Sequence, residues 1–212
     1  MYTPPPFSWT DTAEAADFIA DYPFATVVSR DDALQASHLP LLLDATGETW
    51  RLIGHFARAN GQSEFADGSP VLAIFHGPHA YISPSWYETD QAVPTWNYAV
   101  VHVRGAIRRT GGREVAARHL ATLSDRFENG RPDAWSLERL SPDRIAELLG
   151  HIVPFEIEVE SVEGTRKLSQ HHSPVRRQAV ADRLASSERD DDRAVGALMR
   201  GTLSGSDVDV SQ

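Results

Sequence analysis

Short runs of β-branched and aromatic residues, separated by turn-forming residues, dominate the middle of the chain. β-branched and aromatic side chains favour strands, whereas Asp, Asn, Ser, Gly and Pro favour turns. The separators lie at residues 30–32, 44–47, 67–70 and 76–78. The runs predict strands at residues 24–29, 35–43, 50–56, 71–75, 80–83, 97–109 and 154–159. Short strands with tight connections are typical of an antiparallel barrel.

Helical spacing of apolar residues recurs on both sides of this region. The pattern predicts a helix over residues 10–21, which Pro23 ends, and a second over 112–127 with Val115, Leu120 and Leu123 facing inward. Further helices are expected at residues 141–149, 174–185 and, as a short turn or two, 194–200. Residues 186–212 are polar, acidic and rich in Gly and Ser, so we expect partial disorder there. The sequence thus predicts a mainly β (α+β) domain over residues 1–175 and a helical, partly disordered tail over 176–212.

Composition narrows the possible classes of protein. The chain has 212 residues, 41% of them hydrophobic, which suits one domain of generous size with an appendage. It has no cysteine, which excludes disulfides, Cys-ligated zinc, iron–sulfur clusters and a Cys nucleophile. Neither a signal peptide nor a membrane-spanning apolar run is present, so we expect a cytoplasmic protein with no membrane partner. A net charge of −10 argues against nucleic acid as a direct ligand.

The region from residue 71 to 107 is the least charged and most aromatic part of the chain. Its aromatic residues are Phe75, Tyr81, Trp86, Tyr87, Trp96 and Tyr98. Aromatic residues on strands usually pack in a core, but a pocket for a flat ligand has the same composition. Polar residues interrupt the apolar runs both here, at Asn97, and in the strands before this region, at His38, His55, Arg58 and Asn60. A polar group is costly in a core unless it is paired, so a ligand with an aromatic body and a polar rim is the alternative.

Other kinds of site find little support. His76 and His79 flank Gly-Pro, and the absence of a third ligand at suitable spacing favours a tight turn over a metal site. His171 and His172 have the same weakness, so no metal is predicted. The chain has no G-x-S-x-G, G-x-G-x-x-G or G-x-x-x-x-G-K-[ST] motif, which argues against hydrolase, dinucleotide-fold and kinase functions.

Several longer motifs resemble one known family. They are MYTPPPF at residues 1–7, SHLP at 37–40, GHFARAN at 54–60, FHGPHAYISPSWY at 75–87, VPTWNY at 93–98 and KLSQ at 167–170. In this order, over about residues 1–175, they resemble the PaiB-type family of FMN-binding negative transcriptional regulators. The thirteen-residue motif at 75–87 is far more specific than a short pattern.

The resemblance implies a split β-barrel like that of pyridoxamine-phosphate oxidases and small flavin reductases, forming a homodimer with an FMN site at each subunit boundary. It places Arg58 and Asn60 at the FMN phosphate, and His55 lies in the same motif. The remaining residues that it assigns to the cofactor are His38, Leu39 and Pro40 along the isoalloxazine ring, Tyr81, Ile82 and Ser83 nearby, Trp96 and Asn97 closing the ring pocket, and Lys167 and Ser169, which can come from the partner subunit.

Two positions depart from the family pattern. Gly61-Gln62-Ser63 follows Asn60 where the family commonly has Pro-Gln-Trp, and His171 replaces a usual Asn after KLSQ. The first change removes an aromatic ring from the loop beside the predicted phosphate site. FMN occupancy is therefore less firmly implied than the fold.

Three functions remain open. The resemblance favours a flavin-responsive regulator that contacts a transcriptional partner, while the acidic charge and the lack of a helix-turn-helix pattern oppose direct operator binding. The first alternative is an FMN-dependent oxidoreductase that uses NADH or NADPH, in which His38 or His55 protonates a reduced ligand. The second alternative is a haem-binding split barrel with one of the nine histidines as axial ligand.

Overall fold

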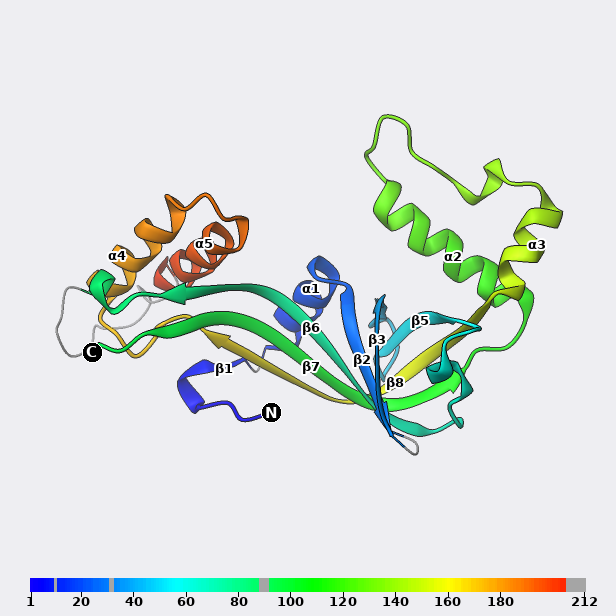
Figure 1. The fold of residues 1–212 in the computed structure, drawn as a ribbon, viewed down its shortest axis with the longest axis horizontal. Coiled ribbons are helices and arrows are strands. Elements are labelled where there is room, and N and C mark those ends of the chain that lie inside the picture. The colour runs from blue at the N-terminus through cyan, green and yellow to red at the C-terminus, as the bar shows by residue number, and fades with distance from the viewer. Residues whose placement is uncertain (10, 31–32, 88–91, 205–212) are drawn as a thin grey trace. The chain divides into compact units, whose positions relative to one another are not determined.

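A computed structural model describes residues 1–9, 11–30, 33–87 and 92–204 (Figure 1). The strands are β1 (Ser8–Trp9), β2 (Phe24–Arg30), β3 (Leu34–Pro40), β4 (Leu42–Asp44), β5 (Arg51–Ala57), β6 (Ser69–Ile82), β7 (Thr95–Arg109) and β8 (Ile152–Lys167). The α-helices are α1 (Thr12–Asp21), α2 (Arg113–Glu128), α3 (Pro142–Gly150), α4 (Pro174–Ala185) and α5 (Asp190–Ser204). Short 3₁₀ helices are η1 (Pro5–Phe7), η2 (Gly61–Glu64), η3 (Pro84–Tyr87) and η4 (Leu137–Arg139).

Within the described residues the strands form one 8-stranded sheet in the order β3-β2-β6-β7-β8-β5-β4, with β1 beside β8. The pairs β2–β3, β2–β6, β4–β5, β5–β8 and β1–β8 are antiparallel. The prediction of a mainly β protein with flanking helices is therefore confirmed. None of the helices in the described part of the chain is long and apolar enough to cross a membrane.

The turn expected at residues 76–78 does not form. Residues 69–82 make one strand, β6, where the sequence predicts two. Buried positions alternate through Val71, Ala73 and Phe75, and then resume one position out of phase at Pro78 and Ala80. The turn was expected because Gly and Pro favour turns, but inside this strand they interrupt side-chain packing without ending the extended backbone.

The chain divides by its internal contacts into two compact units. Unit 1 consists of Met1–Ala15, His76–Val101 and Glu163–Gln212, and unit 2 consists of Ala16–Phe75 and His102–Val162. Strands β6, β7 and β8 each contribute to both. The two units are described separately below.

Aromatic residues of β5, of β8 and of the position directly after η2 form the centre of the core of unit 2. Phe56, Phe65 and Phe155 are each at most 2% exposed, and the rings of Phe56 and Phe155 lie 4.6 Å apart. Burying such a ring contributes roughly 1.5–3 kcal/mol. Gly54 belongs to this core because a Cβ there would lie 2.9 Å from Phe155 Cζ and 2.6 Å from Leu41 Cδ2. The glycine therefore lets β5 pack closely under these side chains.

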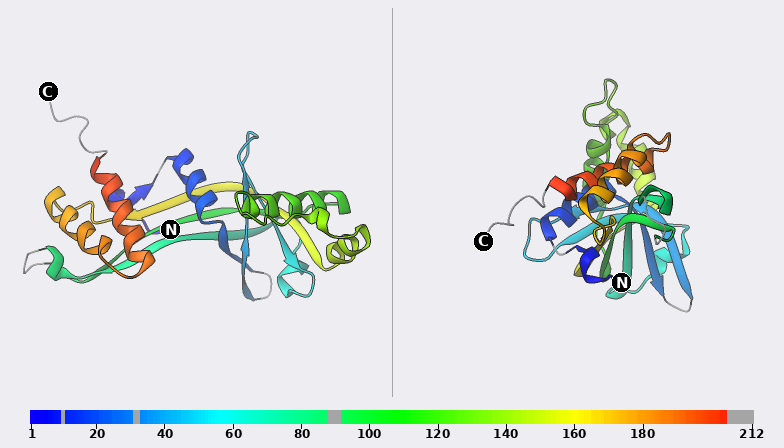
Figure 2. Two further views of the ribbon diagram at one scale, coloured as in Figure 1. Left: turned by 90° about the horizontal axis from the view of Figure 1, so that it is seen from above. Right: turned by 90° about the vertical axis from the view of Figure 1, so that its left-hand side faces the viewer.

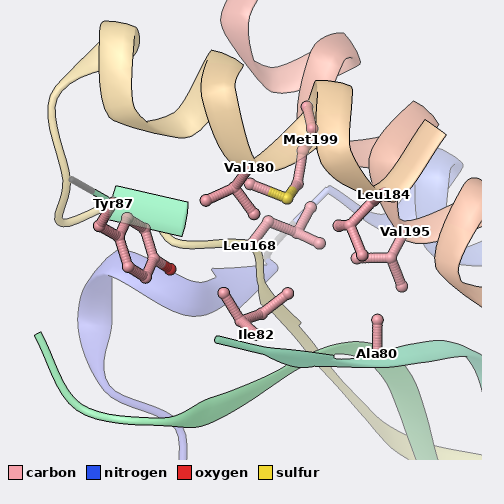
Figure 3. Packing of buried hydrophobic residues seen from close by; sticks show 9 residues of the cluster. Ala80, Ile82, Tyr87, Leu168, Val180, Leu184, Val195 and Met199 are labelled. Carbon is pink, nitrogen blue, oxygen red and sulfur yellow. The ribbon is translucent and has the colours of Figure 1, made fainter. Parts of the chain in front are cut away.

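Helices α4 and α5 cover the apolar face of β6 in unit 1. Figure 3 shows Ala80 and Ile82 of β6 beneath Val180 and Leu184 of α4 and Met199 of α5. The two helices lie side by side in both views of Figure 2. The sequence predicts partial disorder over residues 186–212, and within that range the structure has α5, whose Val195 and Met199 are fully buried in this core. Residues 205–212 lie outside the described part.

Helix α2 presents a different face to unit 2 than its apolar spacing predicts. Val115 is 41% exposed, whereas Ala116 and His119 are buried. The prediction that Val115 faces inward is therefore wrong. The spacing of apolar residues could not reveal which face of α2 is buried, because one of the buried positions is occupied by a histidine, His119, and not by an apolar residue.

Candidate functional site

The residues predicted to line the isoalloxazine ring lie on β3, at the edge of the sheet in unit 2. His38 Nδ1 lies 3.0 Å from Thr26 Oγ1 on β2, and Leu39 is 7% exposed. A Cβ on Gly54 would lie 3.2 Å from Leu39 Cδ1, so β3 and β5 approach closely here. The structure thus brings the His38–Pro40 segment of β3 beside the motif that carries His55 and Arg58.

Arg58 follows β5 and lies at an open cavity of about 500 Å³. Its Nε donates to the carbonyl of Gly150 at 2.7 Å and its Nη2 to that of Ile152 at 2.9 Å. These bonds hold the guanidinium in place while leaving further N–H donors on it. Arg109 and Arg113 also line the cavity, and they were not among the residues predicted from the sequence.

Asn60 points its amide toward β3. Its Nδ2 donates to Ser37 Oγ at 2.8 Å, and its Oδ1 accepts from the backbone N–H of Gln62 at 2.9 Å. It therefore caps η2 and ties this turn to β3. Gln62, inside the departure from the family pattern, is 2% exposed and donates to Val27 O and Ser29 Oγ. Hence the Gln62 amide nitrogen ties this loop to β2 even without an aromatic ring, while its buried Oε1 has no partner among the described residues.

His55 forms a pair with a residue that sequence reasoning missed. Its Nδ1 lies 3.1 Å from Nε2 of His119 on α2, and one imidazole donates to the other. Burial lowers the pKa of His55, and burial together with His55 lowers the pKa of His119 to about 4. Both rings are therefore neutral near pH 7. A sequence separation of 64 residues left no local signal of the pair.

The predicted residues of unit 1 include a buried polar group. Asn97 Nδ2 donates to Ser169 Oγ at 3.0 Å, and Tyr87 Oη lies 2.6 Å from the same oxygen. Ser169 has a left-handed backbone with φ 63°, which the surrounding bonds maintain. Asn97 and Ser169 are both fully buried, so they hold the start of β7 to the segment after β8.

Lys167 lines a second cavity in unit 1, of about 520 Å³. Its Nζ donates to Thr95 Oγ1. His171 and His172 line the same cavity, with ring centroids 4.1 Å apart, and His172 stacks on Tyr87 at 4.1 Å. Burial lowers the pKa of both imidazoles, with Lys167 adding to the effect at His171. The cavity thus combines stacked rings with one ammonium group.

The other predicted residues of unit 1 differ in exposure. Tyr81 and Trp96 are 45% and 48% exposed, with ring centroids 6.0 Å apart in an edge-to-face arrangement. Ser83 Oγ lies 2.8 Å from Ser85 Oγ. Ile82 is fully buried in the cluster under α4 and α5. Tyr81 and Trp96 therefore offer ring surface for a ligand or partner.

These residues fit FMN in unit 2 on two grounds. A guanidinium held at the edge of a cavity, with donors to spare, suits the phosphate. The His38–Pro40 segment offers an edge strand beside it. The predicted site residues divide between the units: those up to Asn60 belong to unit 2 and those from Tyr81 onward to unit 1.

Solved structures of flavin proteins share this fold. The flavocytochrome Anf3 from Azotobacter vinelandii has a TM-score of 0.58 at 14% identity, covering 76% of this chain and 69% of that one. The FAD and haem binding protein from Mycobacterium smegmatis has a TM-score of 0.57 at 15% identity, covering 89% and 80%. The fold class is therefore the flavin-binding split barrel, as predicted.

Residues 1–161 match the protein family described as "Putative FMN-binding domain", and the chain belongs to this family. The protease synthase and sporulation protein PAI 2 of Bacillus subtilis is 34% identical over 205 residues, covering 96% of this chain and 98% of that protein. An uncharacterised protein of Saccharomyces cerevisiae is 34% identical over 110 residues, covering 49% and 65%. The PaiB-type resemblance and FMN as cofactor are thereby confirmed.

Proposed function

We propose that this protein is a cytoplasmic, homodimeric, flavin-responsive regulator, whose bound FMN alters its contact with a transcriptional partner. The observation that carries the proposal is similarity over nearly the whole chain to PAI 2, whose name refers to protease synthesis and sporulation. Bound FMN supplies a group that can be oxidised or reduced. Binding the FMN and positioning it are the tasks of this chain's own residues.

The predicted residues around Arg58 have different physical tasks in this proposal. Arg58 binds the phosphate with donors that remain after its bonds to Gly150 and Ile152. Asn60 is a positioning residue, because both its amide atoms are already bonded to Ser37 and Gln62. His38, with Leu39 and Pro40, presents an edge strand to the ring.

The residues of unit 1 complete the site from the partner subunit. The exposed rings of Tyr81 and Trp96 supply apolar contact surface, and Lys167 supplies a positive charge. Asn97 and Ser169 are buried together and hold that surface in place.

Replacing Arg58 with glutamine is expected to weaken FMN binding about tenfold, the usual consequence of losing one charge-assisted hydrogen bond. The affinity for riboflavin, which has no phosphate, is expected to stay unchanged. Quenching of flavin fluorescence during titration of the purified protein measures both. Arg118→Gln, on the exposed surface of α2, is the matched control. Equal FMN affinity in Arg58→Gln and the control would contradict the assigned role of Arg58.

The regulatory part requires a separate experiment. The protein with and without FMN is titrated against its own promoter and against random DNA, at moderate and at high salt. Tighter binding to the promoter that depends on FMN supports the proposal in its direct form. Micromolar or weaker binding to both DNAs would exclude direct operator binding and leave a protein partner. Steady oxidation of NADH or NADPH by the FMN-loaded protein would favour the oxidoreductase instead.

A further inference from the structure

Two of the three asparagines of this chain are followed by glycine. They are Asn60 and Asn129, whereas Asn97 precedes a tyrosine. Asparagine is one of the thermolabile residues of proteins. The backbone nitrogen of the next residue can attack the side-chain amide, and a glycine at that position has no Cβ to hinder the attack. The two Asn-Gly pairs therefore share the same intrinsic chemistry and differ in their surroundings.

The folded protein holds the side chain of Asn60 through both atoms of its amide. Its Nδ2 donates to Ser37 Oγ at 2.8 Å, and its Oδ1 accepts from the backbone N–H of Gln62 at 2.9 Å. Turning the amide toward the nitrogen of Gly61 requires both of these hydrogen bonds to break. The fold therefore protects this Asn-Gly pair.

Asn129 has no comparable restraint. It lies in the loop that connects α2 to η4, which Figure 1 shows, and it is exposed. Its backbone N–H donates to the carbonyl of Asp125 at 3.0 Å, but its side chain forms no hydrogen bond with the residues that the structure describes. It also lines a cavity of about 460 Å³. The side-chain amide is thus free to turn and open to water.

Gly130 provides the attacking nitrogen. It is exposed and has φ 85°, a left-handed backbone that glycine adopts without strain. Its backbone N–H has no acceptor within the described part of the chain, so no hydrogen bond has to break before this nitrogen loses its proton. The freedom of a glycine backbone allows the rotation that brings the nitrogen to Cγ of Asn129.

We propose that Asn129 is a site of spontaneous deamidation in the folded protein, which converts it to aspartate or isoaspartate through a succinimide with Gly130. The Gly130 nitrogen loses its proton to solvent and bonds to Cγ of Asn129, the Cγ–Nδ2 bond breaks, and ammonia leaves with a proton from solvent. Water then adds to one of the two ring carbonyls and opens the ring. The net change replaces an amide NH₂ with OH and involves no oxidant or reductant. The new carboxylate lies at the C-terminal end of α2, where the helix dipole disfavours negative charge.

The test follows deamidation of the whole chain at mildly alkaline pH, folded and unfolded in guanidinium chloride, until half of the unfolded chain has reacted. Each conversion adds about 1 Da, and fragmentation of proteolytic peptides assigns it to Asn60 or Asn129. In the unfolded chain both are expected to react at similar rates. In the folded protein Asn129 keeps nearly that rate, whereas Asn60 reacts at least about tenfold more slowly, because two hydrogen bonds have to break first.

Asn129→Gln is the matched variant, because glutamine would have to form a larger ring, which closes far more slowly. This variant is expected to lose the mass increase of the folded protein and to keep the reaction of Asn60 in the unfolded chain. The inference is overturned if Asn129 stays an amide in the folded protein while it reacts in the unfolded chain. Equal rates for Asn60 and Asn129 in the folded protein would overturn it as well. Both readouts are independent of flavin, so they hold whatever the FMN titrations show.

Discussion

Replacing Gly105 with alanine is expected to lower the free energy of unfolding by about 3 kcal/mol. Gly105 lies in β7, next to β8 in the sheet, and a Cβ at this position would overlap the carbonyl oxygen of Glu158. A backbone carbonyl cannot turn aside as a flexible side chain can, so the strands would have to separate. Urea unfolding followed by circular dichroism measures the loss.

Gly111→Ala is the matched control for this prediction. Gly111 lies shortly after Gly105 in the sequence, and a Cβ at Gly111 would meet no atom within 4 Å. Its stability is expected to stay within about 0.5 kcal/mol of wild type. If the two alanine variants unfold at the same urea concentration, β7 and β8 do not approach each other as closely at Gly105 as described.

Local patterning predicted most strands but not where they continue. The residues of β7 and the first part of β8 alternate or run apolar, so both were expected. The second half of β8 and the middle of β6 contain polar residues, Gly and Pro, and local propensity marks such positions as turns. They stay extended because pairing with neighbouring strands outweighs the local preference.

In the C-terminal tail, composition predicted less regular structure than the chain forms. Asp190, Asp191 and Asp192 indicate a solvated segment, but acidic residues in the first turn also stabilise a helix start. Behind them, Val195 and Met199 lie one turn apart and bury against α4. Few apolar residues suffice when they share one face, and composition averaged over the tail conceals this.

Some residues of the candidate site could be predicted from the sequence and others could not. Motif resemblance indicated Arg58 most specifically, because its position in GHFARAN is recognisable without a structure. Arg109, at the end of β7, Arg113, at the start of α2, and His119, within α2, carry no motif. Such residues are found only when the chain is folded, because the contacts are set by packing between segments more than 45 residues apart in sequence, such as Arg109 with Ser63.

Lowering the pH from 7 to 5 is expected to destabilise the protein through His119. Its pKa is about 4 in the folded protein, below the ordinary 6.5, because it is buried beside His55. Between these two values the unfolded chain binds the proton more tightly, so stability is present above pH 6.5 and is lost as the pH falls toward 4. The linkage amounts to about 2 kcal/mol between pH 7 and 5.

Urea unfolding at both pH values tests this with two variants. In His119→Gln the loss between pH 7 and 5 is expected to be about 2 kcal/mol smaller than in wild type. It does not vanish, because burial also lowers the pKa of His55. His151→Gln, which changes an exposed histidine after α3, should keep the wild-type loss. Equal losses in wild type and His119→Gln would mean that this imidazole is solvated and that α2 does not hold it against β5.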